Sequence, residues 1–255
     1  MRYFLMLTLV VGFSVQQFGC ATTGVSRDGL TGTAKDHVDR GVKLHEQGDL
    51  AGAITEFGIA IGLDPTYVNA YYNRGLAMAD KGDSEGAIGE FRTVLNLEPN
   101  HELAHTNLGL ALYNTGDLEG AITEFRTVLR RDPTNVLAHY NLGLALYNTG
   151  DLEGAITEFH TVLRLDPDHV DAHTNLGVAL FKKGDTEGAI SEFRTALGLN
   201  PNHVNAHYNL GLALLKTGDA LSARKELEEA LVLLPDTPEN QKTIRTITLM
   251  LGRIN

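Results

Sequence analysis

Hydrophobic and small residues recur along this chain with a period of 34 residues. Each repeat has glycine at position 8, alanine at position 20, and phenylalanine, replaced once by leucine, at position 24. On a helix over the first half of a repeat, positions 3, 7, 10 and 11 lie on one side, so we expect them to pack against other helices. The six repeats span residues 34–67, 68–101, 102–135, 136–169, 170–203 and 204–237.

Glycine, aspartate and proline mark the predicted helix ends. A Gly-Asp pair lies in the middle of every repeat, from Gly48-Asp49 to Gly218-Asp219. We expect the glycine to end one helix in the left-handed conformation and the aspartate to cap the next. Near the end of each repeat stands a proline, which ends the second helix: Pro65, Pro99, Pro133, Pro167, Pro201 and Pro235. The pattern predicts an all-α stack of helix-turn-helix repeats.

A different helix is predicted after the sixth proline. Ile244, Ile247, Leu251 and Ile254 have helical spacing, and Arg245 stands where a seventh repeat would need glycine. We therefore predict that residues 238–255 form a capping helix over the last apolar face. An alternative is that this apolar face joins copies of the chain, which would make the protein a self-assembling homo-oligomer.

Residues 34–237 resemble the tetratricopeptide repeat (TPR) family. The six repeats follow the family pattern with few departures. This pattern has a large residue at position 4, Leu at 7, Gly at 8, Ala at 20, Phe at 24 and Pro at 32. Position 4 is Tyr71 once and otherwise histidine, where the family usually has tryptophan. The resemblance implies a right-handed superhelical α-solenoid that binds protein or peptide partners in a concave groove and has no enzymatic activity.

In that family the first helix of each repeat lines the groove with positions 2, 5, 6, 9, 12 and 13. Asparagine at position 6 offers a donor and an acceptor to an extended peptide, although it is a poor residue for a helix interior. The candidate groove residues are Asn73, Asn107, Asn141, Asn175 and Asn209 at position 6, Tyr72, Tyr140 and Tyr208 at position 5, Tyr113, Tyr147 and Phe181 at position 12, and Lys182 and Lys216 at position 13. The alternative is that the asparagines form hydrogen bonds between adjacent first helices, or that they simply persist from recent duplication, since the third and fourth repeats are nearly identical.

Position 13 changes its charge along the chain. It is acidic in the first two repeats, at Glu46 and Asp80, and basic in the last two, at Lys182 and Lys216. We expect a bound peptide to place its acidic part near the two lysines. The formal net charge of −11 disfavours nucleic acid and anionic lipid as partners.

Three histidine pairs raise the possibility of a metal site, because residues four apart on a helix can share a metal ion. The pairs are His101 with His105, His169 with His173, and His203 with His207. The second histidine of each pair occupies the bulky packing position 4, and we see no carboxylate that recurs beside the pairs. We therefore predict no metal site. No phosphate-binding loop or nucleophile motif is present, so we expect no cofactor and no catalysis.

The first residues are typical of an export signal. Arg2 precedes an uncharged stretch from Tyr3 to Val15, and the only cysteine, Cys20, follows Gly19. This resembles the lipobox of bacterial lipoproteins, which implies a signal peptide over residues 1–19, lipidation of Cys20, a flexible tether over residues 20–33 and a periplasm-facing protein anchored by its lipid in the outer membrane. Ordinary signal cleavage after Ala21, which would leave a soluble periplasmic or secreted protein, and an uncleaved anchor helix are the alternatives. The resemblance to bacterial TPR lipoproteins implies a role in envelope assembly, secretion or pilus biogenesis, and no residue in the sequence chooses among the three.

Overall fold

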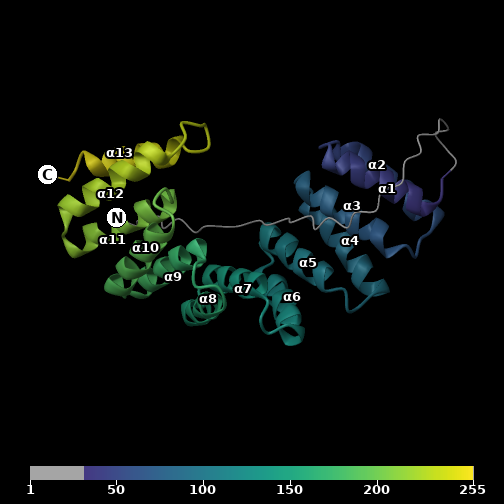
Figure 1. The fold of residues 1–255 in the computed structure, drawn as a ribbon, viewed down its shortest axis with the longest axis horizontal. Coiled ribbons are helices and arrows are strands. Elements are labelled where there is room, and N and C mark those ends of the chain that lie inside the picture. The colour runs from purple at the N-terminus through teal and green to yellow at the C-terminus, as the bar shows by residue number, and fades with distance from the viewer. Residues whose placement is uncertain (1–31, 255) are drawn as a thin grey trace. The chain divides into compact units, whose positions relative to one another are not determined.

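The computed structural model describes residues 32–254. The predicted signal peptide, Cys20 and nearly all of the predicted tether lie outside the described residues. Within them the chain forms thirteen α-helices and no strand (Figure 1): α1 Ala34–Glu46, α2 Leu50–Leu63, α3 Val68–Asp80, α4 Ser84–Leu97, α5 Glu102–Thr115, α6 Leu118–Arg131, α7 Val136–Thr149, α8 Leu152–Leu165, α9 Val170–Lys183, α10 Thr186–Leu199, α11 Val204–Thr217, α12 Ala220–Leu233 and α13 Gln241–Leu251. The all-α repeat fold is therefore confirmed.

The described residues divide into two compact units at Pro133. The N-terminal unit, residues 32–133, contains α1 to α6, and the C-terminal unit, residues 134–254, contains α7 to α13. In each unit the two helices of a repeat pack against each other, and each second helix also packs against the first helix of the next repeat.

The turn inside each repeat has the predicted geometry. The six turn glycines have φ values between +82° and +105°, where an L side chain would be strained: Gly48, Gly82, Gly116, Gly150, Gly184 and Gly218. The aspartate that follows each of them accepts a hydrogen bond from a backbone N–H in the first turn of the second helix. For example, Asp117 Oδ1 lies 3.0 Å from the Gly120 N–H. The Gly-Asp pair thus ends one helix and caps the next.

Small and large residues meet between the two helices of each repeat. A methyl group added to Gly109 would come within 2.6 Å of Phe125, and one added to Gly143 would come within 2.7 Å of Phe159. Both phenylalanines are completely buried. The glycine at position 8 therefore lets the ring at position 24 lie against the backbone of the first helix, as the two columns in the sequence predict.

The first helices lie on the inner side of each unit. They contact one another from repeat to repeat, α1 with α3 and α3 with α5 in the N-terminal unit, α7 with α9 and α9 with α11 in the C-terminal unit. Within each unit, by contrast, consecutive second helices do not contact one another. Because only the first helices of successive repeats come close together, each unit curves toward its first helices. The side of the first helices that faces away from the second helices is therefore the inner face of the unit.

The last helix covers the end of the C-terminal unit (Figure 1). Ile247 and Ile254 are buried in one apolar cluster with Tyr208, Leu212 and Leu227. Arg224 on α12 donates hydrogen bonds to the backbone carbonyls of Leu251 and Ile254. Ile247 and Ile254 of the predicted apolar face thus pack inside the chain, and the alternative that this face joins two copies stays a prediction. None of the helices in the described part has the length and apolarity to cross a membrane.

Candidate functional site

The asparagines at position 6 lie between neighbouring first helices. Asn107 Nδ2 on α5 donates to the Tyr72 hydroxyl on α3 at 2.9 Å, and Asn175 on α9 makes the same bond to Tyr140 on α7 at 2.8 Å. Each pair joins position 6 of one repeat to position 5 of the repeat before it. The hydrogen-bonding alternative therefore holds for these two asparagines.

Burial also corrects the expected exposure of this column. Asn107, Asn141, Asn175 and Asn209 are at most 8% exposed. Asn73 is half-buried, and its side-chain amide donates to the Asn69 carbonyl in its own helix at 2.7 Å. The interpretation of position 6 as a row of exposed amides is thus wrong for four of the five, because the adjacent first helices approach closely enough to cover them.

The tyrosines at position 5 are mainly packing residues. Tyr140 and Tyr208 are almost completely buried, whereas Tyr72 is half-buried. The Tyr72 ring lies 5.0 Å from the ring of His101, and Tyr140 stacks on His169 at the same centroid distance. These rings therefore offer little surface to a peptide.

The exposed part of the predicted groove is a rim at the C-terminal ends of the first helices. Lys182 on α9 places its ammonium 4.2 Å from the ring centre of Tyr147 on α7, and Lys216 on α11 lies 4.7 Å from the ring centre of Phe181 on α9. The two rings are 9% and 8% exposed, and both lysines are exposed. We call these four residues the cation–aromatic rim.

Positions 12 and 13 of neighbouring repeats also meet in the N-terminal unit, where they form a histidine–carboxylate contact. There position 12 of the first repeat is His45, whose Nε2 lies 2.6 Å from the Asp80 carboxylate at position 13 of the second. Tyr113, the third predicted aromatic at position 12, is half-buried. Positions 12 and 13 of successive repeats thus meet as an ion pair at His45 and Asp80 in the N-terminal unit and as lysines on aromatic rings in the C-terminal unit.

The lysines of the rim differ from their neighbours. Lys183 is paired with Glu153 at 2.7 Å. In the described part of the chain, by contrast, neither Lys182 nor Lys216 has a carboxylate within 4.0 Å. Two cations therefore stand one repeat apart on the inner face of a strongly acidic protein, free to meet an anionic group.

The histidines at position 4 have regular carboxylate partners, which the sequence analysis missed. Nδ1 of each lies 2.5 to 2.7 Å from a glutamate at position 23 on the second helix of the same repeat. The pairs are His37 with Glu56, His105 with Glu124, His139 with Glu158, His173 with Glu192, and His207 with Glu226. The signal was present as a glutamate in every repeat, 19 residues after position 4.

The first histidine of each suspected metal pair caps a helix. Nδ1 of His101, His169 and His203 each accepts a hydrogen bond from a backbone N–H three residues later, at 3.2 Å. Among residues 32–254 no three histidine, cysteine or acidic side chains converge as a metal site would need. The two histidines of each pair have separate partners inside the chain.

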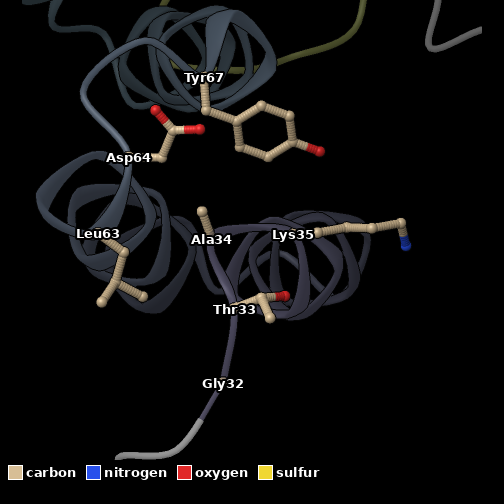
Figure 2. A pocket seen from close by; sticks show the side chains of 7 residues that line it. All are labelled: Gly32, Thr33, Ala34, Lys35, Leu63, Asp64 and Tyr67. Carbon is tan, nitrogen blue, oxygen red and sulfur yellow. The ribbon is translucent and has the colours of Figure 1, made fainter.

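A hollow of about 530 Å³ lies at the start of the N-terminal unit (Figure 2). It is lined by Gly32, Thr33, Ala34, Lys35, Leu63, Asp64 and Tyr67. Three of its polar side chains are already used: Lys35 pairs with Asp39 at 2.7 Å, Asp64 accepts from Thr66, and Thr33 caps α1 through Asp36. The hollow therefore presents no converging polar groups for a ligand.

Family models match nearly all of the repeat region. A "Tetratricopeptide repeat" model matches residues 106–160, 140–202 and 179–238, which together exceed half of the chain. A "TPR repeat" model matches residues 41–82, and a second "Tetratricopeptide repeat" model matches residues 68–101. The chain belongs to the tetratricopeptide repeat family. A search of the curated proteins found no match.

Several solved TPR structures are similar to this chain. YrrB, described as "a TPR protein with an unusual peptide-binding site", is 25% identical over 68% of this chain and 89% of its own, with a TM-score of 0.61. MamA from Desulfovibrio magneticus RS-1 is 26% identical over 67% of this chain and 96% of its own, with a TM-score of 0.64. Pseudomonas aeruginosa pilF, 17% identical over 84% of this chain and 97% of its own with a TM-score of 0.67, is similar in fold alone.

Membership of the TPR family limits what the site does. TPR proteins bind protein or peptide partners and are in general interaction scaffolds rather than enzymes. In this TPR chain the inner face is the surface on which first helices from successive repeats lie side by side. The cation–aromatic rim is an exposed part of that face with unpaired positive charge, and it is the candidate site.

Proposed function

We propose that this TPR protein is a non-enzymatic scaffold in the cell envelope that binds an extended peptide or a partner helix on its inner face. The observation that carries the proposal is the cation–aromatic rim, Tyr147 with Lys182 and Phe181 with Lys216. The partner segment is acidic, with carboxylates that reach the two lysines. YrrB, whose structure is similar, is described as having a peptide-binding site.

The chemistry of the rim supports an acidic partner. An ammonium above an aromatic ring is held in place by the negative face of the ring, while its remaining N–H groups point to solvent. A lysine held this way loses less side-chain freedom when it binds a carboxylate than a free one does. Because the rest of the chain is acidic, the two lysines also select for the orientation of the partner.

A labelled peptide tests this function directly. The probe is a 12-residue peptide with an acidic Glu-rich half and a neutral Gly/Ser half, compared with a version in which lysine replaces every glutamate. We expect binding of the acidic peptide, measured by fluorescence anisotropy at low salt, and roughly tenfold weaker binding by the Lys182→Ala, Lys216→Ala double variant. Equal affinity for the two peptides would contradict the proposal.

The matched control removes two other lysines. Lys183→Ala with Lys225→Ala changes the net charge by the same amount, and both residues are exposed, but neither lies on an aromatic ring of the rim. We expect this variant to bind the acidic peptide about as well as the parent. If it loses as much affinity as the rim variant, the effect belongs to net charge and not to the rim.

The envelope location rests on the N-terminal sequence. We propose that residues 1–19 direct export, that Cys20 carries a lipid anchor, and that the residues after it tether the repeats to the outer membrane. Expression of the full chain in a Gram-negative host with radiolabelled palmitate tests this. Label should enter the parent and not Cys20→Ala. Label in neither, with both proteins recovered from the periplasmic fraction, would instead support ordinary cleavage.

A further inference from the structure

Three position-4 histidines bind oxygen atoms through both ring nitrogens. Nδ1 of His105, His173 and His207 faces a glutamate carboxylate, and Nε2 faces the backbone carbonyl of a proline in the preceding turn. The Nε2 distances are 3.2 Å to Pro99, 3.0 Å to Pro167 and 2.8 Å to Pro201, respectively. Each imidazole therefore links its own first helix, the second helix and the preceding turn.

This arrangement favours the protonated ring. A carboxylate and a carbonyl only accept hydrogen bonds, whereas a neutral imidazole has one N–H and one lone pair. A neutral ring would thus turn a lone pair toward one of the two oxygens. Only the imidazolium donates to both.

The second repeat makes the same links without a histidine. The Tyr71 hydroxyl donates to the Pro65 carbonyl at 3.1 Å, and Arg74 donates to Glu90 at 2.7 Å. Tyrosine and arginine therefore do separately what one protonated histidine does in the third, fifth and sixth repeats, and arginine keeps its charge at any physiological pH. The geometry thus calls for a cation opposite the position-23 glutamate.

We propose that His105, His173 and His207 form a pH-sensitive clamp between the two helices of their own repeats, closed when the imidazole is protonated and weakened when it is neutral. The clamp is repeated in series, so its closure stabilises several repeats at once. The second repeat, with Tyr71 and Arg74, is a version that does not respond to pH.

The charged groups around two of these histidines act in the same direction. The hydrogen bond to Glu192 raises the pKa of His173 above its ordinary value; burial opposes this, and the Pro167 carbonyl and the charges of Glu192 and Asp168 add to it. Glu226, again opposed by burial, raises the pKa of His207, with the Pro201 carbonyl and Glu229 adding to it.

The sign of the pH dependence follows from a pKa that is higher in the folded state. The stability that the His173 and His207 clamps contribute is complete below the ordinary histidine pKa of about 6.5 and is lost as the pH rises through the raised folded pKa of each residue. The clamp is tested by differences at individual histidines.

NMR titration of the histidine side chains of the full chain tests the clamp. Below the ordinary histidine pKa of about 6.5 we expect both ring nitrogens of His173 and His207 to be protonated, with titration midpoints above that value. Glu192→Gln should lower the His173 midpoint by about one unit and leave His207 unchanged, because removing the anion removes the main stabilisation of the imidazolium. Neutral rings at pH 6.5, or a His173 midpoint that Glu192→Gln does not move, would overturn the proposal.

Thermal unfolding gives the second readout. The His173→Gln, His207→Gln double variant should melt below the parent by a margin that is at least about 2 °C larger at pH 6.0 than at pH 8.5. His160→Gln is the matched control, since this exposed histidine lies on α8 outside position 4, and its margin should not change with pH. A margin for the double variant that is equal at both pH values would mean that the histidines only pack.

Discussion

The hydroxyl of Tyr140 accepts a hydrogen bond from the buried side chain of Asn175 at 2.8 Å and so joins the first helices of the fourth and fifth repeats. We expect Tyr140→Phe to destabilise the protein by about 1 to 3 kcal/mol, because it leaves the buried amide donor without its acceptor. Chemical denaturation of the parent and the variant measures the difference.

A double-mutant cycle separates this bond from general packing. Tyr140→Phe combined with Asn175→Ala should cost less than the sum of the two single changes, with a coupling of about 0.5 kcal/mol or more. Additive losses would mean that the hydrogen bond contributes nothing to the contact between the repeats.

Gly143 is required by the ring that lies against it. Its replacement by alanine brings a methyl group to 2.7 Å from Phe159, so either the ring or the helix must move. We expect Gly143→Ala to lower the free energy of unfolding by about 1 to 3 kcal/mol. Gly89→Ala is the control: Gly89 lies inside α4 with no atom within 4 Å of an added methyl group, and this change should stabilise by up to about 1 kcal/mol. Similar losses in both variants would contradict the close-packing explanation.

Asp151 caps α8 by accepting the Gly154 N–H at 2.9 Å. We expect Asp151→Ala to cost about 1 kcal/mol of stability, and Asp151→Asn to cost less because the amide oxygen still accepts that bond. Hydrogen exchange at the first turn of α8 should speed up in the alanine variant only. Equal exchange in the two variants would show that charge rather than the hydrogen bond stabilises this helix end.

The last helix protects the end of the C-terminal unit through Ile247, which is completely buried. Ile247→Ala should cost about 2 to 4 kcal/mol in urea denaturation, because it opens a cavity against the cluster with Leu212 and Leu227. Leu249→Ala, on the same helix at a site that is 63% exposed, should change stability by less than about 0.5 kcal/mol. An equal effect of both changes would mean that α13 does not cover the core.

The sequence by itself determined the repeats, their helix ends and their packing residues. These features are local or periodic: the Gly-Asp turn needs only neighbouring backbone groups, and Gly143 and Phe159 stand in columns that recur every 34 residues. Because six copies carry the same pattern, one packing solution serves them all. The capping role of Ile247 also followed from helical spacing and from the unpaired end of a stack.

Only the tertiary structure decided which side chains remain exposed and which residues pair. Asn175 and Tyr140 are 35 residues apart, and His173 and Glu192 are 19 apart, so these contacts depend on the angle and separation of packed helices. A helical stripe contains both covered and open positions, and the spacing alone does not tell them apart. Close approach of the first helices covers the asparagines and leaves Lys182 and Lys216 exposed on the inner face.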